Sequence, residues 1–137
     1  MNYHPRMIRS ALVLFAAVAL CFVGIVPAGA SPSAPPCSFT LSPPQVVQLS
    51  GTNVVTATLS PAACDQSDTY LSVACVQLQG SDGPGQCAQG QGILPAQVHF
   101  APYRPGATYV STGRGCSSKG NPPQPFCRPA GPLTATL

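Results

Sequence analysis

Residues 53–60 read Asn-Val-Val-Thr-Ala-Thr-Leu-Ser, and this stretch indicates the fold class. Val55, Ala57 and Leu59 alternate with threonine and serine, which is the period-two pattern of a strand with one buried face. The Ser50-Gly51 pair just before the stretch is typical of a tight turn. A half-buried β-strand that follows a turn is therefore the first element that the sequence predicts.

Residues before this stretch predict a first strand that is broken in the middle. Phe39 and Leu41, and then Val46 and Val47, have side chains that favour strands. The Pro43-Pro44 pair between them interrupts the pattern. Because proline has no N–H donor, such an interruption suits a strand at the edge of a sheet.

Downstream residues predict further short strands separated by turns. The alternating stretches are 71–78, with a bulge near Cys75, and then 96–100, 107–112 and 133–137. The glycines of 80–92 predict a mobile turn region, and the prolines of 115–132 predict a stiff extended loop. Six or seven short strands, with turn signals about every ten residues, predict a small immunoglobulin-like antiparallel β-sandwich.

The first thirty residues have the pattern of a signal peptide. Arg6 and Arg9 precede an apolar run over 11–26, which is shorter than the ~20 apolar residues of a membrane-spanning helix. Small residues lie at positions −3 and −1 from the expected cleavage point, which the sequence places at Ala28, Ala30 and Ser31. We therefore expect three segments: a signal peptide (1–30), a flexible Ser/Pro/Ala tail (31–36) and a secreted domain (37–137).

The cysteines of the secreted domain predict disulfides. Loss of Cys21 with the signal peptide leaves an even number of cysteines, and thiols of an exported chain are not kept reduced. A zinc site fits less well, because no pair has the C-x₂-C spacing and His99 is the one histidine after residue 30. We expect about three disulfides among six residues: Cys37, Cys64, Cys75, Cys87, Cys116 and Cys127.

The positions of the turns favour one pairing among the fifteen that six cysteines allow. Cys75 and Cys87 flank the turn residues 80–83, so a hairpin there sets them opposite each other. Cys116 and Cys127 flank residues 120–123 in the same way. Cys37 and Cys64 are then left to pair, and a bridge between Cys64 and Cys116 is the alternative.

Charge is scarce after residue 30. Four basic residues face three aspartates, so the net charge of the expected domain is +1: Arg104, Arg114, Lys119 and Arg128 against Asp65, Asp68 and Asp82. That charge is too small for the counterion-release binding of DNA or RNA, so we expect no nucleic-acid partner. Arg104 and Arg114 bracket the strand around Tyr109, and one hypothesis is that both arginines contact the same anion.

Catalytic groups are also scarce. The expected domain has no glutamate, no G-x-S-x-G motif and one histidine, His99, which lies on the polar side of its strand. Asp65 and Asp68 are too few for the six to eight oxygen ligands of calcium. We therefore expect no enzymatic activity, no cofactor and no metal.

The stretch Tyr103-Arg104-Pro105-Gly106-Ala107-Thr108-Tyr109 resembles the turn into the penultimate strand of fibronectin type III and other immunoglobulin-like domains. Residues 41–44 leading to 53–59 are similar to the first two strands of such domains. The resemblance covers most of residues 37–137. It implies a two-sheet sandwich in which Tyr109 makes the corner hydrogen bond of that family.

The chain as a whole resembles small secreted proteins of mycobacteria and other actinobacteria in its signal peptide and its Ala/Pro/Gly-rich composition. We expect a secreted, monomeric binding or structural module, extracellular or attached to the cell wall, that engages a protein or cell-envelope partner through end loops or a sheet edge. Candidate contact residues are Arg104, Arg114, Tyr103 and Tyr109.

The alternative function is that of a carrier, similar to the enediyne-antibiotic carrier proteins of actinobacteria. Such a carrier holds a small apolar ligand in the cleft of its sandwich. The side chains expected near that ligand are aromatic: Tyr70, Phe100, Tyr103 and Phe126.

Overall fold

A computed structural model describes residues 29, 36–83 and 85–137. The predicted signal peptide apart from Gly29, its cleavage residues Ala28, Ala30 and Ser31, and most of the expected tail lie outside these ranges. The described chain forms eight strands: β1 (Cys37–Leu41), β2 (Gln45–Leu49), β3 (Thr52–Cys64), β4 (Ser67–Leu78), β5 (Gln86–Gln91), β6 (Ala96–Phe100), β7 (Thr108–Lys119) and β8 (Gln124–Thr136).

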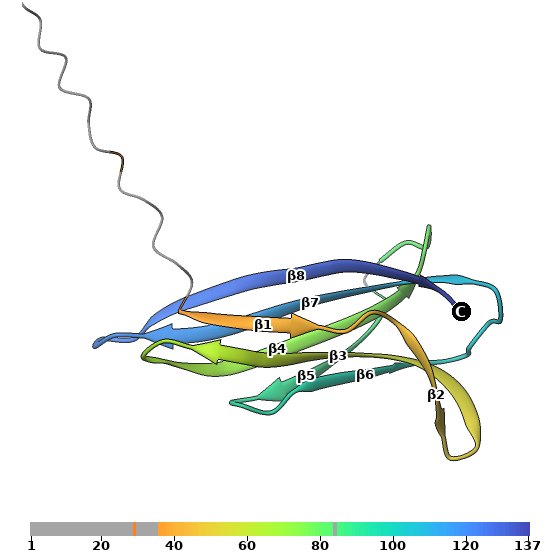
Figure 1. The fold of residues 1–137 in the computed structure, drawn as a ribbon, viewed down its shortest axis with the longest axis horizontal. Coiled ribbons are helices and arrows are strands. Elements are labelled where there is room, and N and C mark those ends of the chain that lie inside the picture. The colour runs from red at the N-terminus through yellow and green to blue at the C-terminus, as the bar shows by residue number, and fades with distance from the viewer. Residues whose placement is uncertain (1–28, 30–35, 84) are drawn as a thin grey trace, which may run out of the picture. The chain divides into compact units, whose positions relative to one another are not determined.

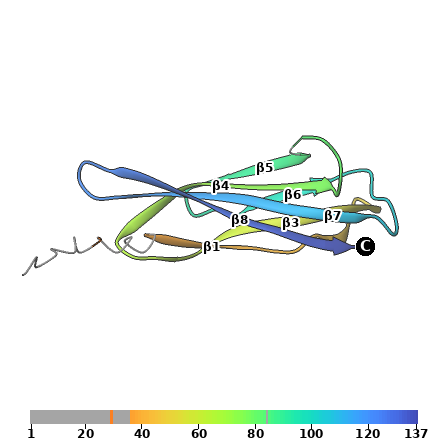
Figure 2. The same ribbon diagram turned by 90° about the horizontal axis from the view of Figure 1, so that it is seen from above.

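The strands form two antiparallel sheets (Figure 1). In the first sheet, β1 and β2 follow each other along one side of β3, and β6 pairs with the other side. The second sheet has the order β5-β4-β7-β8. Figure 2 shows the strands of both sheets running along a common direction. The prediction of an immunoglobulin-like antiparallel β-sandwich is confirmed, with eight strands instead of six or seven.

The proline pair breaks the first strand as predicted, at a sheet edge. β1 ends at Leu41 and β2 begins at Gln45. Between them, the Ser42 N–H donates to the Thr58 carbonyl (2.9 Å), and the Thr58 N–H donates to the Ser42 hydroxyl oxygen (2.9 Å). These two bonds keep the chain beside β3 where the prolines cannot donate.

Both sheets contribute to the core, and part of it consists of large side chains from the first sheet packed on glycines of the second. Val55, Ala57 and Leu59 of β3 are fully buried, as their alternation predicted. A side chain on Gly113 of β7 would crowd Leu59, and one on Gly115 would overlap the ring of Phe39. The glycines of β7 therefore make room for side chains from the opposite sheet.

Strand β4 places different residues in the core from those that its apolar pattern indicated. Ser72, Ala74 and Val76 are fully buried, whereas Leu71 and Val73 are only half-buried. Ser72 and Ala74 pair with Gly115 and Gly113 of β7, the positions that side chains of the first sheet approach closely. The predicted bulge near Cys75 is also wrong: the register of β4 against β7 is continuous there and shifts between Thr69 and Leu71.

Two segments that we predicted as turn or loop contain strands. Residues 80–92 include β5, which pairs with β4 from Val76 to Leu71. Residues 115–132 include the end of β7 and most of β8, which together form one long hairpin. The prolines of β8 are compatible with this arrangement because β8 pairs with β7 on one side only, so an edge position tolerates a missing N–H donor.

All three disulfides join residues that face each other on adjacent strands of one sheet. Cys37 pairs with Cys64 across β1 and β3, Cys75 with Cys87 across β4 and β5, and Cys116 with Cys127 across β7 and β8. These are the pairs that the turn positions favoured. Among the described residues, no disulfide links the two sheets, so packing rather than covalent bonds holds the sheets together.

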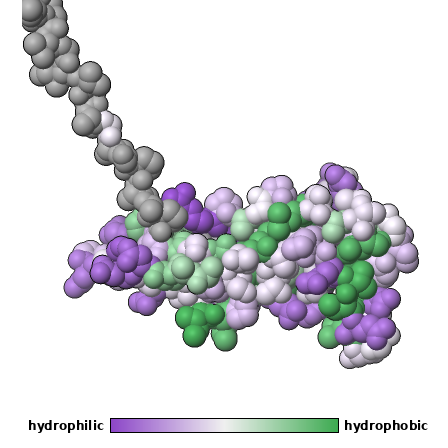
Figure 3. Space-filling view, viewed as in Figure 1, coloured by the Kyte–Doolittle hydropathy of each residue, from purple (hydrophilic) through white to green (hydrophobic). Residues whose placement is uncertain are grey.

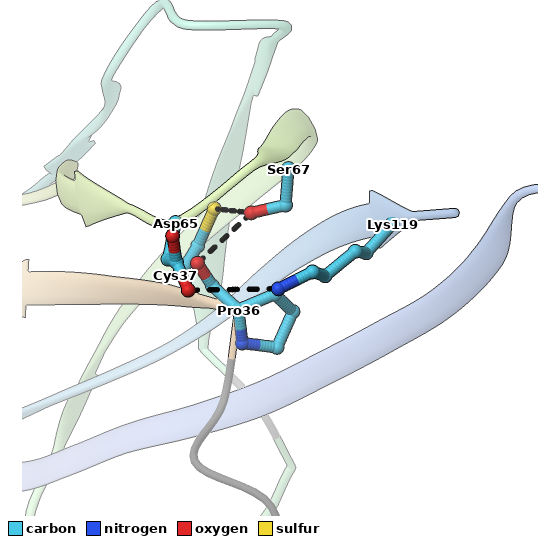
Figure 4. A network of polar contacts seen from close by, with 5 residues as sticks. All are labelled: Pro36, Cys37, Asp65, Ser67 and Lys119. Atoms are coloured by element: carbon cyan, nitrogen blue, oxygen red, sulfur yellow. Dashed lines mark hydrogen bonds and ion pairs between the residues drawn. The ribbon is translucent and has the colours of Figure 1, made fainter.

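The start of β1 is fixed by polar contacts with the β3–β4 turn (Figure 4). The Ser67 hydroxyl donates to the Pro36 carbonyl (2.9 Å) and lies 3.0 Å from the Cys37 sulfur. The Asp65 N–H donates to the same carbonyl (2.7 Å). Lys119 and Asp65 form an ion pair (3.6 Å), which contributes little because both side chains are solvent-exposed to a large extent.

Candidate functional site

The β5–β6 turn exposes two large aliphatic side chains. Ile93 is 83% exposed and Leu94 is 62% exposed, the highest values among the large hydrophobic residues that the structure describes. Figure 3 shows an apolar protrusion at this connection, and polar surface surrounds much of it. Exposed aliphatic side chains of this size are a typical feature of interaction sites when they lie together.

The backbone of the turn is held in place by the neighbouring strands. The Gly92 N–H donates to the Tyr70 carbonyl (3.1 Å), and the Thr69 hydroxyl donates to the Gly92 carbonyl (2.9 Å). The Leu94 N–H donates to the Gln91 carbonyl (3.1 Å), which closes the turn. The φ angle of Gly92 is +61°, a conformation that favours glycine. Ile93 and Leu94 therefore project from an ordered turn.

Gly90 permits the turn to fold back on its own strand. A Cβ atom at this position would collide with the backbone of Leu94 and Pro95. The close approach explains why a glycine lies inside β5, where it otherwise weakens a strand. Ile93 and Leu94 were not among the candidate residues predicted from the sequence. The available signal was the presence of two aliphatic residues between Gly92 and Pro95, in a connection that is expected to be polar.

Tyr109 was expected to contact a partner, but it is a core residue and its side chain does not reach the surface. Its ring is fully buried and packs edge-on against Phe100, with ring centroids 5.6 Å apart. Its hydroxyl oxygen accepts a hydrogen bond from the Arg104 N–H (2.8 Å). This is the corner hydrogen bond that the resemblance to immunoglobulin-like domains implied. Tyr109 thus fixes the β6–β7 connection.

Arg104 and Arg114 lie on different elements of the fold. Arg104 lies in the β6–β7 connection, where its backbone bonds to the inward-pointing Tyr109. Arg114 lies in β7, five residues after Tyr109. It is exposed and lies opposite Val73 of β4 and Pro129 of β8. Five residues of a strand span about 16 Å. The hypothesis that both arginines contact one small anion stays a prediction.

The four aromatic residues expected near a carried ligand lie in two separate places. Phe100 and Tyr103 pack against the core cluster around Tyr109. Tyr70 lies near the β7–β8 hairpin, with its hydroxyl 3.6 Å from the Cys127 sulfur. Phe126 is exposed in β8 of the same hairpin. No pocket is detected within residues 36–83 and 85–137.

The polar residues considered for chemistry are dispersed. His99 is half-buried in β6, where it pairs with Thr56 of β3. Asp65 is engaged with Lys119, and Asp68 and Asp82 are exposed at separate positions. In the part of the chain that the structure covers, no three His, Cys, Asp or Glu side chains are grouped in a way that could hold a metal ion.

No helix within the described ranges is long and apolar enough to cross a membrane. The three disulfides indicate that the chain matures in an oxidising compartment. In comparisons with protein-family models, curated proteins and solved structures, the chain matches none of them. The geometry of the fold is therefore the basis for a functional proposal.

Proposed function

We propose that the protein is a secreted, non-enzymatic binding module that inserts Ile93 and Leu94 into an apolar pocket of an extracellular protein partner. The observation that carries this proposal is the exposure of both side chains on a turn held by three hydrogen bonds. Binding sites in loops positioned by a rigid scaffold are common. The tip is convex, so its partner requires a concave apolar surface.

The energetics of the tip support binding. Burial of an isoleucine or leucine side chain contributes about 1.5–3 kcal/mol, and two such residues together provide a substantial part of a micromolar affinity. Because Gly92 and Leu94 already have their backbone hydrogen-bond partners, little conformational entropy is lost when the partner binds. A mobile loop with the same side chains would bind more weakly.

The location outside the cell rests on the predicted signal peptide together with the disulfides. The order of the strands and the hydrogen bond of Tyr109 support a fibronectin type III-like module, a class used widely for recognition at cell surfaces. The composition supports an origin in mycobacteria or related actinobacteria. We infer that the partner is a protein of the cell envelope or the surrounding medium.

The proposal is tested by site-specific photo-cross-linking. A photoreactive side chain is placed at Ile93 or Leu94, and the matched control is Gln97, which is exposed in β6 a few residues away. The oxidised protein is incubated with the culture medium and envelope fraction of its producing organism. We expect a defined cross-linked protein from positions 93 and 94 and none from position 97.

Competition completes the test. An excess of unlabelled wild-type protein is expected to abolish the cross-link, whereas the double variant Ile93→Ser/Leu94→Ser is expected to leave it. Both residues are exposed, so the double variant retains the fold. Equal competition by the wild type and the double variant, or the same adduct from position 97, would show that the tip is not the binding site.

A further inference from the structure

Most of the sheet edges are protected against pairing with another strand. The free edge of β8 contains prolines, which cannot donate hydrogen bonds: Pro125, Pro129 and Pro132. Strands β5 and β6 are the edges of their sheets on the same side of the sandwich, and they lie next to each other in both ribbon views (Figures 1 and 2). On the other side, β1 packs near β7 and β8. The remaining edge is that of β2.

Strand β2 has none of these protections. Its sequence, Gln45-Val46-Val47-Gln48-Leu49, contains no proline, no glycine and no charge. Val46 is 36% exposed and Leu49 is 48% exposed. Among the described strands, β2 pairs with β3 alone. Figure 1 shows the β2–β3 hairpin projecting from the rest of the first sheet, and Figure 3 shows apolar surface over it.

The hairpin geometry identifies the backbone groups on the free edge. Ser50 and Gly51 both have positive φ angles (53° and 79°), as a two-residue type I′ turn requires. The flanking residues Leu49 and Thr52 face each other, so this closing pair is hydrogen-bonded. Because hydrogen-bonded and non-hydrogen-bonded pairs alternate, Val46 and Gln48 direct their N–H and C=O groups away from β3.

We propose that β2 pairs in antiparallel orientation with β2 of a second copy of this chain, about a two-fold axis at Val47. In this register Val46 lies opposite Gln48 of the second copy, and these residues exchange backbone hydrogen bonds. Val47 lies opposite Val47, and Gln45 lies opposite Leu49. The axis is perpendicular to the sheet, so the first sheets of the two copies join into one continuous sheet.

The absence of charge favours a second copy as the occupant of this edge. Residues 36–64 contain no Asp, Glu, Lys, Arg or His, so two copies meet at β2 without like-charge repulsion. The strand is also self-complementary, because the proposed register places valine on valine at its centre and each glutamine opposite an aliphatic residue. A partner recognised by charge would find no complementary group here.

The length of β2 determines the strength of the association. Five residues span about 17 Å, and a strand pair of that length buries less than the ~1,000 Å² of a stable interface. The dimer is therefore weak and reversible, and it forms as the protein concentration rises. This proposal differs from our expectation of a monomer, which stays a prediction until association is measured. It uses a different surface from Ile93 and Leu94 and does not depend on the proposed binding function.

Charge exchange at the two-fold axis provides the test. In the variants Val47→Lys and Val47→Glu, two like charges meet at the centre of the dimer, whereas an equal mixture of the two variants places opposite charges there. Matched controls are Gln97→Lys and Gln97→Glu, which introduce the same charges at an exposed position of β6 in the same sheet. Sedimentation velocity of the oxidised protein is measured from about 10 μM to about 1 mM.

We expect the wild type and both Gln97 variants to show a sedimentation coefficient that rises with concentration. Each Val47 variant alone is expected to remain monomeric, and their mixture is expected to associate at least tenfold more strongly than either. Wild-type protein that stays monomeric throughout, or dimers that persist in both Val47 variants, would overturn the proposal. A mixture that fails to associate would also overturn it, because the two-fold register would be wrong.

A second variant keeps the test independent of the folding of the Val47 variants. Gln48→Pro removes an N–H group that faces the free edge and leaves the bonds between β2 and β3 intact. We expect this variant to lose the concentration-dependent rise, and Gln48→Ala to retain it. Retention of the rise by Gln48→Pro would contradict the assignment of the free-edge groups.

Discussion

The contact between Gly115 and Phe39 provides a sharp test of how the two sheets pack. Gly115 is buried in β7, and a Cβ atom there would overlap three atoms of the Phe39 ring, which comes from β1 in the other sheet. Cys37, two residues before the ring, is bonded to Cys64, so β1 has little freedom to retreat. We therefore expect Gly115→Ala to destabilise the protein although alanine is the better strand residue.

The magnitude follows from two opposing contributions. Overpacking of a core costs about 1–3 kcal/mol, and replacement of a strand glycine by alanine returns about 0.5–1 kcal/mol. The free energy of unfolding should thus fall by about 1–2 kcal/mol in Gly115→Ala. In a Phe39→Ala background the ring is gone, only the favourable contribution remains, and the same substitution should stabilise by about 0.5–1 kcal/mol.

The assay is equilibrium unfolding in urea of the four oxidised proteins that form this double-mutant cycle. The sign of the Gly115→Ala effect is expected to reverse between the two backgrounds, with an interaction energy of about 2 kcal/mol. The slope against urea should stay constant, because each protein exposes a similar surface on unfolding. A loss of equal size in both backgrounds would refute the proposed stacking of β1 on β7.

Three further substitutions test individual features by the same measurement. Tyr109→Phe removes the hydroxyl group that accepts the Arg104 N–H and should cost about 1 kcal/mol; no change would mean that the corner bond contributes nothing. Ser50→Asn should stabilise the type I′ turn by up to about 1 kcal/mol, because asparagine tolerates positive φ better than serine; destabilisation would contradict this turn type. Ser72→Ala should stabilise by about 1 kcal/mol or more, because the hydroxyl of Ser72 is buried without a hydrogen-bond partner in the described chain; a loss of stability would indicate a partner.

Local patterns in the sequence were sufficient for elements whose partners are close along the chain. The alternation at Val55, Ala57 and Leu59 identified the central strand of the first sheet. Turns placed midway between cysteines identified the hairpin disulfides, because opposite positions of a hairpin are determined by its turn. In both cases the deciding pattern lies within one strand or one hairpin, and the paired cysteines are only 12 and 11 residues apart in the sequence.

Features that depend on distant partners were not predictable in this way. The inner face of β4 holds Ser72 and Ala74 beside Gly115 and Gly113 of β7, which Phe39 and Leu59 approach closely, and no local pattern reveals that complementarity. The first part of β8, residues 124–132, was predicted as a loop because its prolines were weighed without knowing that one side of the strand is free. The exposed tip at Ile93 likewise depends on hydrogen bonds from another strand.

The three disulfides also determine what happens when an extracellular protease cuts the chain. The Ser50-Gly51 turn lies between Cys37 and Cys64, and the β4–β5 and β7–β8 turns lie between the members of the other two pairs. A cut at any of these three turns leaves both fragments covalently attached, and the strands beside the cut stay paired. The β5–β6 and β6–β7 connections lie outside all three closed loops. Cleavage next to Ile93 would therefore separate the chain into two pieces with no covalent link, held together by core packing and by the β3–β6 and β4–β7 hydrogen bonds.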